Sequence, residues 1–264
     1  MIQTLKHSLY ATLFKYGVVF RPASDTPFGI RWYRDIQYFP NGARIETVFD
    51  IGANTGQTAV QLVRHFPKSR IYSFEPVPST FQALVRNTKN YGNVEPICCA
   101  LGAARGAGKM TAESLSVGNR LVVDAESTAS AGGLLEVPVD TVDAFCTERK
   151  IQRVNLLKID TEGYEMSVLK GALNLLTEKR IDFILAECDF SRRAGEPHGD
   201  FIEISQHLSA FGFKVVSFYT GGVDDLGWVW GDVLFRETSH AQPGRIACSP
   251  AGKAPSSIEK QPPR

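Results

Sequence analysis

The chain lacks several features that would place it in a common functional class. It has no C-x-x-C pair and no H-E-x-x-H motif, which argues against a zinc ribbon or a zinc-protease site. Its formal net charge is +1, so the charge pattern of a nucleic-acid-binding protein is missing. Its five cysteines are scattered, which favours a reducing compartment over a disulfide framework. We therefore expect a cytoplasmic protein without a nucleic-acid partner.

A long hydrophobic run is also missing. No stretch reaches the roughly 18 apolar residues of a transmembrane helix. Near the start, Leu5, Leu9 and Leu13 recur at helical spacing beside Lys6 and Lys15, without the small-residue cleavage site of a signal peptide. The pattern favours an amphipathic helix that packs on the domain or on a second copy of the chain, and peripheral contact with a membrane surface stays open.

The middle of the chain has a regular alternation of strand-like and helical patterns. This alternation is typical of an α/β fold with a mostly parallel sheet and helices on both faces. We expect strands near residues 47–51, 70–74, 94–100, 154–159, 181–186, 214–219 and 228–235. We expect helices near residues 57–66, 78–90, 140–145, 166–176 and 201–211. The last two strands, joined by Gly221 and Gly222, are predicted to form an antiparallel hairpin at the sheet edge.

The sequence divides the chain into three parts. Residues 46–237 form the predicted α/β domain, and the Gly- and Ala-rich segment 102–137 within it is interpreted as an antiparallel excursion or flap. Residues 1–45 are predicted to form a helical and aromatic lid, whose aromatic stretch 30–39 either packs on the core or lines the substrate pocket. Residues 238–264 are rich in Pro, Ser, Ala and Lys and are expected to be disordered.

The run V-F-D-I-G-A-N-T-G at residues 48–56 predicts a buried strand followed by a ligand-binding turn. Ligands of doubly wound sheets bind outside the carboxyl ends of the strands. A dinucleotide site uses G-x-G-x-x-G to hold pyrophosphate, whereas Gly52 and Gly56 stand at G-x-x-x-G spacing. The turn suits the methionine end of S-adenosylmethionine. Gly52 lets the backbone approach the ligand, Asn54 and Thr55 lie in the turn, and Asp50 can reach the ammonium group.

A second acid completes the predicted donor site. Glu75 ends the next strand, at the distance from the turn where an acid accepts both ribose hydroxyls. The adenine is expected near the end of the third strand, around Cys99, Ala100 and Leu101. The predicted cofactor-binding residues are Asp50, Gly52, Asn54, Thr55, Gly56, Glu75, Pro76, Ala100, Leu101 and Asp160.

The segment at residues 157–165 reads L-K-I-D-T-E-G-Y-E. With V-F-D-I-G-A-N-T-G at 48–56 and F-E-P at 74–76, it resembles the FkbM-type family of S-adenosylmethionine-dependent methyltransferases. The resemblance implies a Rossmann-like class I methyltransferase fold with a seven-stranded sheet. It also implies methyl transfer to a hydroxyl oxygen of an acceptor such as a sugar, a glycolipid or a secondary metabolite.

An aliphatic hydroxyl is a poor nucleophile, so a base or a metal has to help remove its proton. The candidate catalytic residues are Asp160, Glu162, Glu187 and His198, with Asp160 expected near the methyl donor and Glu187 as its partner. Converging carboxylates could hold Mg²⁺, although no residue is assigned as a metal ligand. Structural roles stay open: Glu162 as a helix cap or as a partner of Lys158, Glu187 as a hydrogen-bond acceptor and His198 as a loop residue. Glu165 is expected on a solvated helix face.

Two other functions remain open at this point. An NAD-dependent oxidoreductase would require G-x-G-x-x-G after the first strand, and that motif is missing. A non-catalytic cofactor-binding protein would be expected to have lost the pair formed by Asp50 and Glu75, and both acids are present.

Overall fold

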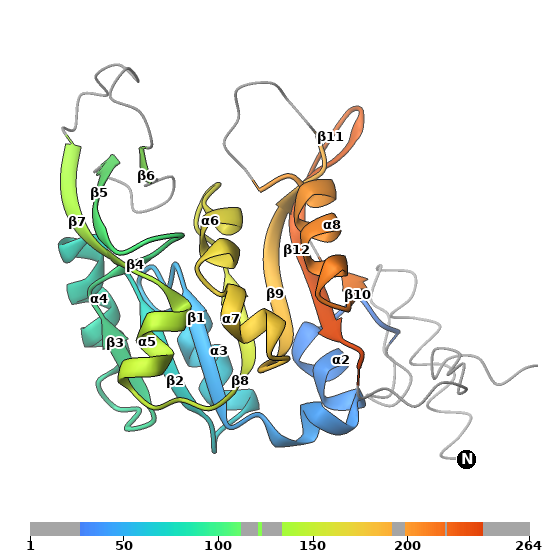
Figure 1. Cartoon of the computed structure of the whole chain (residues 1–264), viewed down its shortest axis with the longest axis horizontal. Coiled ribbons are helices and arrows are strands. Elements are labelled where there is room, and N and C mark those ends of the chain that lie inside the picture. Colours follow the sequence, from blue (N-terminus) through green and yellow to red (C-terminus); the bar gives the residue numbers. More distant parts are fainter. Residues whose placement is uncertain (1–26, 112–120, 123–133, 192–198, 220, 240–264) are drawn as a thin grey trace, which may run out of the picture.

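The computed structural model describes residues 27–111, 121–122, 134–191, 199–219 and 221–239. The main sheet has the strand order β10-β12-β9-β8-β1-β2-β3, and a short strand, β11, pairs with β12 (Figure 1). Its strands are β1 (Thr47–Ile51), β2 (Arg70–Phe74), β3 (Val94–Ile97), β8 (Val154–Ile159), β9 (Ile181–Asp189), β10 (Phe213–Phe218), β11 (Gly222–Asp224) and β12 (Gly227–Glu237).

The pairing within the sheet confirms the predicted fold class. Strand β1 pairs in parallel with β2 on one side and with β8 on the other, and β3 and β9 continue the parallel arrangement. The strand order therefore reverses direction at β1, which creates the crevice where open α/β sheets bind ligands. Strand β12 runs antiparallel to both β9 and β10.

The predicted antiparallel hairpin at the sheet edge is confirmed, because β10 pairs antiparallel with β12, but its turn differs from the prediction. Strand β12 inserts between β9 and β10, so β10 lies at the edge of the sheet. The tight turn joins β11 to β12, where Asp224 faces Gly227, and it does not lie at Gly221 and Gly222. A Cβ atom at Gly221 would stand 1.7 Å from the carbonyl oxygen of Trp230, so this glycine permits a close backbone approach instead of a reversal.

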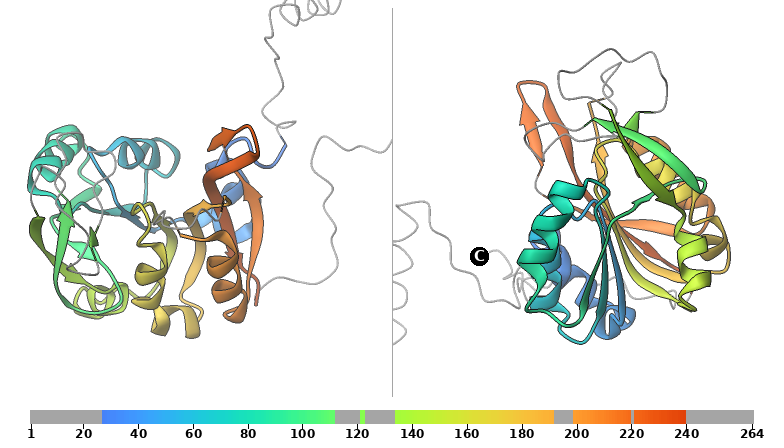
Figure 2. Two further views of the ribbon diagram at one scale, coloured as in Figure 1. Left: turned by 90° about the horizontal axis from the view of Figure 1, so that it is seen from above. Right: turned by 90° about the vertical axis from the view of Figure 1, so that its left-hand side faces the viewer.

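Helices cover both faces of the sheet (Figure 2). Ile36 of α2 (Trp32–Tyr38) and Leu62 of α3 (Gln57–His65) are fully buried in one hydrophobic cluster. The opposite cluster contains apolar side chains of α5 (Val142–Glu148), α6 (Glu165–Lys170), α7 (Leu173–Thr177) and α8 (Phe201–Ala210). The other helices among the described residues are α4 (Pro78–Thr88) and a short 3₁₀ helix, η2 (Pro40–Arg44). The main sheet therefore lies between two buried hydrophobic clusters, which hold its strands in place.

The predicted helix over residues 166–176 is divided into α6 and α7. A Cβ atom at Gly171 would lie 2.0 Å from the carbonyl oxygen of Gly102, so the chain approaches a distant loop at this point. The carbonyl of Gly171 also accepts a hydrogen bond from the backbone N–H of Asp143 at 3.0 Å. These tertiary contacts interrupt the helix, and the local sequence pattern does not contain them.

A second sheet stands beside the carboxyl edge of the first, with the order β4-β7-β5-β6. Its strands are β4 (Ala100–Leu101), β5 (Gly106–Thr111), β6 (Leu121–Val122) and β7 (Leu134–Asp140). Strand β5 pairs antiparallel with both β6 and β7, as expected for the excursion over residues 102–137. Met110 and Val137 pack with Val77 and Ala100 in a small hydrophobic cluster.

The described part of the N-terminal segment packs against the side of the main sheet that contains β9 and β12. Ile36 is completely buried, and the carboxylate of Asp35 accepts a hydrogen bond of 2.7 Å from the Tyr219 hydroxyl. The predicted helix near the start and most of the predicted tail lie outside the described residues. Within the described ranges, no helix is both long and apolar enough to cross a membrane.

Candidate functional site

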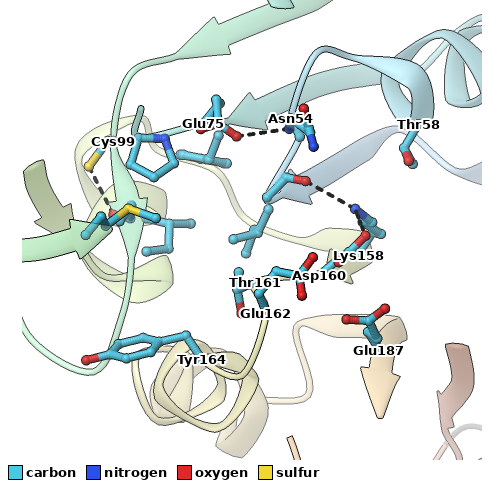
Figure 3. A pocket seen from close by; sticks show the side chains of 18 of the residues that line it. Asn54, Thr58, Glu75, Cys99, Lys158, Asp160, Thr161, Glu162, Tyr164 and Glu187 are labelled. Atoms are coloured by element: carbon cyan, nitrogen blue, oxygen red, sulfur yellow. Dashed lines mark hydrogen bonds and ion pairs between the residues drawn. The ribbon is translucent and has the colours of Figure 1, made fainter. Parts of the chain in front are cut away.

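A cavity of about 400 Å³ opens at the carboxyl edge of the main sheet, where β1, β2, β8 and β9 end (Figure 3). This volume lies within the roughly 300–1,000 Å³ of small-molecule sites. The cavity brings together most of the predicted residues: Gly52, Asn54, Glu75, Pro76, Ala100, Leu101, Asp160, Glu162 and Glu187. Further lining residues, which the sequence analysis did not assign to the site, include Gln57, Thr58, Met110, Lys158, Thr161, Tyr164, Trp230 and Asp232. None of residues 27–45 lines it.

The turn after β1 has an unusual backbone. Gly52, Asn54 and Gly56 have positive φ angles of 75°, 49° and 95°. The N–H groups of Gly52 and Ala53 both donate to the carbonyl oxygen of Phe74, so the turn is tied to the end of β2. A Cβ atom at Gly52 would lie 1.7 Å from the carbonyl oxygen of Asp160. A glycine is therefore required at position 52 because the end of β8 lies against it. The sequence pattern indicated a different reason, the approach of a ligand.

Two predicted residues of the turn do not line the cavity. The carbonyl oxygen of Thr55 accepts a hydrogen bond of 2.8 Å from the side-chain amide of Asn87 on α4. A Cβ atom at Gly56 would lie 2.9 Å from a methyl carbon of Leu84, also on α4. In this structure both residues hold the turn against α4.

Glu75 is fixed at one side of the cavity by two backbone hydrogen bonds. One carboxylate oxygen accepts from the N–H of Asn54 and the other from the N–H of Val77, each at 3.0 Å. Burial of the side chain raises the pKa of Glu75, whereas these two hydrogen bonds lower it in part. Each oxygen retains acceptor capacity, so the carboxylate is oriented and can still accept two ligand hydroxyls.

Lys158 connects the two acids that the sequence analysis placed near the donor. Its Nζ atom lies 3.1 Å from Asp160 and 3.4 Å from Asp50. Burial alone would lower the pKa of Lys158, but the two carboxylates raise it above its usual value. Asp50 is fully buried, which raises its pKa, and it does not line the cavity. Both acids contact Lys158, but the Asp50 side chain is fully buried, whereas 38% of the Asp160 side chain is exposed.

Glu187 and Asp232 lie opposite each other on β9 and β12. Burial, followed by the charges of Asp160 and Glu162, raises the pKa of Glu187 to about 8. Burial also raises the pKa of Asp232 to about 6, although Lys158 acts in the opposite direction. Glu187 is therefore mostly protonated at neutral pH, while Asp232 is mostly ionised. The sequence predicts that this last strand is antiparallel. Its first half, which carries Asp232, should therefore lie at the carboxyl edge of the parallel strands, and this could have identified Asp232.

The loop after β8 is held by Glu165, which was expected on a solvated helix face. That prediction is wrong because Glu165 is 1% exposed. One carboxylate oxygen accepts from the N–H and hydroxyl of Thr161, both at 2.9 Å, and the other accepts from the N–H of Gly199 at 3.1 Å. This network positions Glu162, which lines the cavity with a φ of 53°.

Two further expectations concern the catalytic groups. His198 lies outside the described residues. Among the residues that the structure describes, no group of three or more His, Cys, Asp or Glu side chains is placed to hold a metal ion. Asp160 and Asp232 instead act on Lys158, whose pKa they raise, so the suggested Mg²⁺ site gains no support.

Comparison with known proteins adds an independent observation. A family model described as the methyltransferase FkbM domain matches residues 50–215. The chain is 30% identical over 200 residues to Methyltransferase 1 of Beauveria bassiana, which covers 69% of this chain and 76% of that protein. It is 26% identical over 143 residues to the hexuronic acid methyltransferase AglP of Haloferax volcanii, which covers 54% of this chain and 55% of that protein. The chain thus spans about half the length of AglP.

Solved structures with a similar fold have lower similarity. Fibrillarin of Aeropyrum pernix in complex with S-adenosyl-L-methionine has a TM-score of 0.43 and 14% identity, covering 73% of this chain and 66% of that chain. TrmK of M. capricolum in complex with S-adenosyl-homocysteine has a TM-score of 0.45 and 10% identity, and the match covers 81% of this chain and 70% of that chain. The matched family region contains the turn at Gly52, the acid Glu75 and the cluster around Lys158. The chain belongs to the FkbM family of S-adenosylmethionine-dependent methyltransferases and has the Rossmann-like fold of class I methyltransferases.

Proposed function

We propose that the protein transfers the methyl group of S-adenosylmethionine to a hydroxyl oxygen of a small-molecule acceptor. The acceptor is a sugar, a glycan- or lipid-linked hydroxyl compound or a secondary metabolite. The observation that carries the proposal is the cavity at the switch point of the sheet. Glu75 stands on one side of this cavity, and Asp160 and Glu187 stand on the other (Figure 3).

The donor would occupy the side of the cavity next to β1 and β2. Glu75 is oriented to accept the two ribose hydroxyls, and Ala100 and Leu101 offer apolar contacts to the adenine. The backbone of the turn at Gly52 and Asn54 would hold the methionine end. Asp50 is too deeply buried for direct contact with the ammonium group, so we assign that contact to Asp160, which is more exposed.

The chemistry needed from the protein is alignment and removal of a proton. When bound, S-adenosylmethionine supplies a methyl group that is already activated. The protein has to hold the acceptor oxygen in line with this group, which lowers the entropic part of the barrier. We assign the base to Glu187, because its pKa of about 8 makes it a stronger base than an ordinary glutamate. Asp160 is ion-paired with Lys158 at 3.1 Å and is better suited to orient ligands.

Calorimetry with S-adenosylmethionine and with NAD tests the donor assignment. We expect binding of S-adenosylmethionine and none of NAD, because the turn lacks the glycine spacing of a pyrophosphate site. Binding of NAD alone would overturn the proposal. A screen of hydroxyl compounds that measures formation of S-adenosylhomocysteine then tests catalysis and identifies acceptors. Donor binding without transfer to any alcohol would instead favour the non-catalytic alternative.

The two assigned roles can be separated with single substitutions and a confirmed acceptor. Asp160→Asn is expected to weaken donor binding by about tenfold, since it removes a charged hydrogen-bond partner. Glu187→Gln is expected to leave donor binding within about twofold and to lower turnover. Equal losses of donor affinity in both variants would contradict the division of roles.

A further inference from the structure

The lining of the cavity is strongly acidic on the side away from Glu75. Besides Glu75, four acidic side chains line the cavity (Asp160, Glu162, Glu187 and Asp232), against a single basic one, Lys158. Lys158 is already engaged by Asp50 and Asp160, which lie 3.4 and 3.1 Å from its Nζ atom. Asp232 therefore adds a negative charge that no other basic side chain of the described lining balances, and Glu187 adds a second one in its ionised form. A bound donor, which carries one net positive charge, offsets only part of this surplus.

An aromatic side chain stands beside these acids. Trp230 precedes Asp232 by two residues on β12, so both side chains project from the same face of the strand. Both residues line the cavity, and Trp230 is 41% exposed. Trp230 and Asp232 thus border the same space.

The position of Trp230 is built into the fold by the glycine pair of the C-terminal hairpin. A Cβ atom at Gly222 would lie 2.4 Å from the indole nitrogen of Trp230, and one at Gly221 would lie 1.7 Å from its carbonyl oxygen. Gly222 and Trp230 are also partners in the pairing of β11 with β12. Gly222 therefore provides the room in which the indole lies against β11, and Gly221 permits the close approach of the Trp230 backbone.

An aromatic face next to carboxylates matches the chemistry of a sugar ring. One face of such a ring presents C–H groups that pack on an aromatic surface, and its hydroxyls donate hydrogen bonds to carboxylates. A carboxylate on the acceptor would instead lie against Asp232 and the acids around it, and like charges in a partly buried site repel.

We propose that Trp230 and Asp232, with Glu187, form the acceptor subsite, and that it takes an uncharged sugar or polyol ring and rejects the carboxylate-bearing counterpart. This inference rests on the proposed function, because it specifies the acceptor of the same reaction. It also gives the Trp230 side chain a role that no motif predicted.

Matched sugar probes can test the subsite without knowledge of the natural acceptor. The protein is saturated with S-adenosylhomocysteine, and the affinities of methyl glucoside and of methyl glucuronide are measured by NMR titration. We expect the glucuronide to bind at least about tenfold more weakly. Asp232→Asn is expected to reduce this difference to about twofold, because it removes the charge and keeps the shape.

The role of Trp230 has a matched control on the same strand. Trp230→Ala is expected to weaken methyl glucoside binding by about tenfold or more, and Trp230→Phe to restore part of the loss. Trp228 is similarly exposed, at 48%, but does not line the cavity, so Trp228→Ala should leave probe binding within about twofold. S-adenosylhomocysteine affinity, measured in each variant, shows whether the donor side is intact.

Three results would overturn the inference: equal or tighter binding of the glucuronide, equal effects of the two tryptophan substitutions, or no detectable binding of methyl glucoside at tens of millimolar. Failure of the proposed function would look different. It would appear as a lack of S-adenosylmethionine binding, or as a lack of methyl transfer to every alcohol tested, whatever the probes show.

Discussion

The two sides of the cavity are held in different ways. On the proposed donor side, Glu75 and the turn at Gly52 are fixed by backbone hydrogen bonds and by a close backbone contact. On the proposed acceptor side, Glu187, Asp232 and Lys158 influence one another mainly through charge and burial. A rigid geometry suits the binding of one fixed donor, and a charge pattern that a few substitutions can alter suits the selection of an acceptor.

The largest expected effect would come from removal of the proposed base. Glu187→Gln should lower kcat by about 10²–10⁴-fold with a confirmed acceptor, because a positioned base contributes that much. The wild-type kcat/KM should rise with pH and level off above about 8, since only ionised Glu187 accepts a proton. Steady-state kinetics across pH 6–10 check both points. An unchanged ascending limb in the variant would show that another group titrates.

The donor turn should respond to a single methyl group. Gly52→Ala places a Cβ atom 1.7 Å from the Asp160 carbonyl oxygen at a φ of 75°, so we expect a loss of about 3 kcal/mol or more in unfolding free energy. Denaturant unfolding measures this loss. Gly92→Ala is the matched control, because its Cβ would meet nothing within 4 Å, and it should stay within about 0.5 kcal/mol. Similar effects of the two changes would refute the packing argument.

A milder change tests the rigidity of the donor side. Glu75→Gln keeps the size of the side chain but places an amide donor against the N–H of Asn54 or of Val77. We expect S-adenosylmethionine to bind about tenfold more weakly, and kcat at donor saturation to change by less than about threefold. Calorimetry and saturation kinetics separate these quantities. A large fall in kcat with normal affinity would place Glu75 closer to the reaction than its position suggests.

A further expected effect concerns the pH dependence of stability. Because the folded protein raises the pKa of Glu187 from 4.5 to about 8, the folded state retains a proton that the unfolded chain loses. The stability contribution of this group is therefore greatest at acidic pH and is lost as pH rises from about 4.5 to 8. Glu187→Gln should raise Tm at pH 9 more than at pH 5, at about 2–4 °C for each kcal/mol. Equal shifts at both pH values would indicate that burial does not perturb Glu187.

The meeting of Gly52 and Glu75 at one cavity could be predicted from the sequence because these residues are close in the chain. The turn at Gly52 and the acid Glu75 belong to consecutive strands, and a parallel sheet brings the ends of such strands together. Lys158 and Asp232 were missed because their roles depend on which strands become neighbours, including the antiparallel insertion of β12. The depth of Asp50 was missed for a similar reason, since it follows from the packing of β1 between β2 and β8.

The remaining differences also come from contacts between distant segments. Gly171 interrupts a helix because of Gly102, and Gly222 leaves room for the indole of Trp230. Glu165 has the spacing of a solvated helix residue, yet it binds a loop that begins four residues earlier and another that lies beyond residue 198. Local patterns identify the elements, but they do not show which element another one will meet.

The contact between Gly52 and the carbonyl of Asp160 has a thermodynamic consequence. A shift of the turn on donor binding has to be shared by the strand end that carries Asp160, because no free space separates them. Donor occupancy and acceptor affinity are then linked, and linkage is reciprocal. An acceptor that binds more tightly to the donor-loaded protein must tighten the binding of the donor by the same factor.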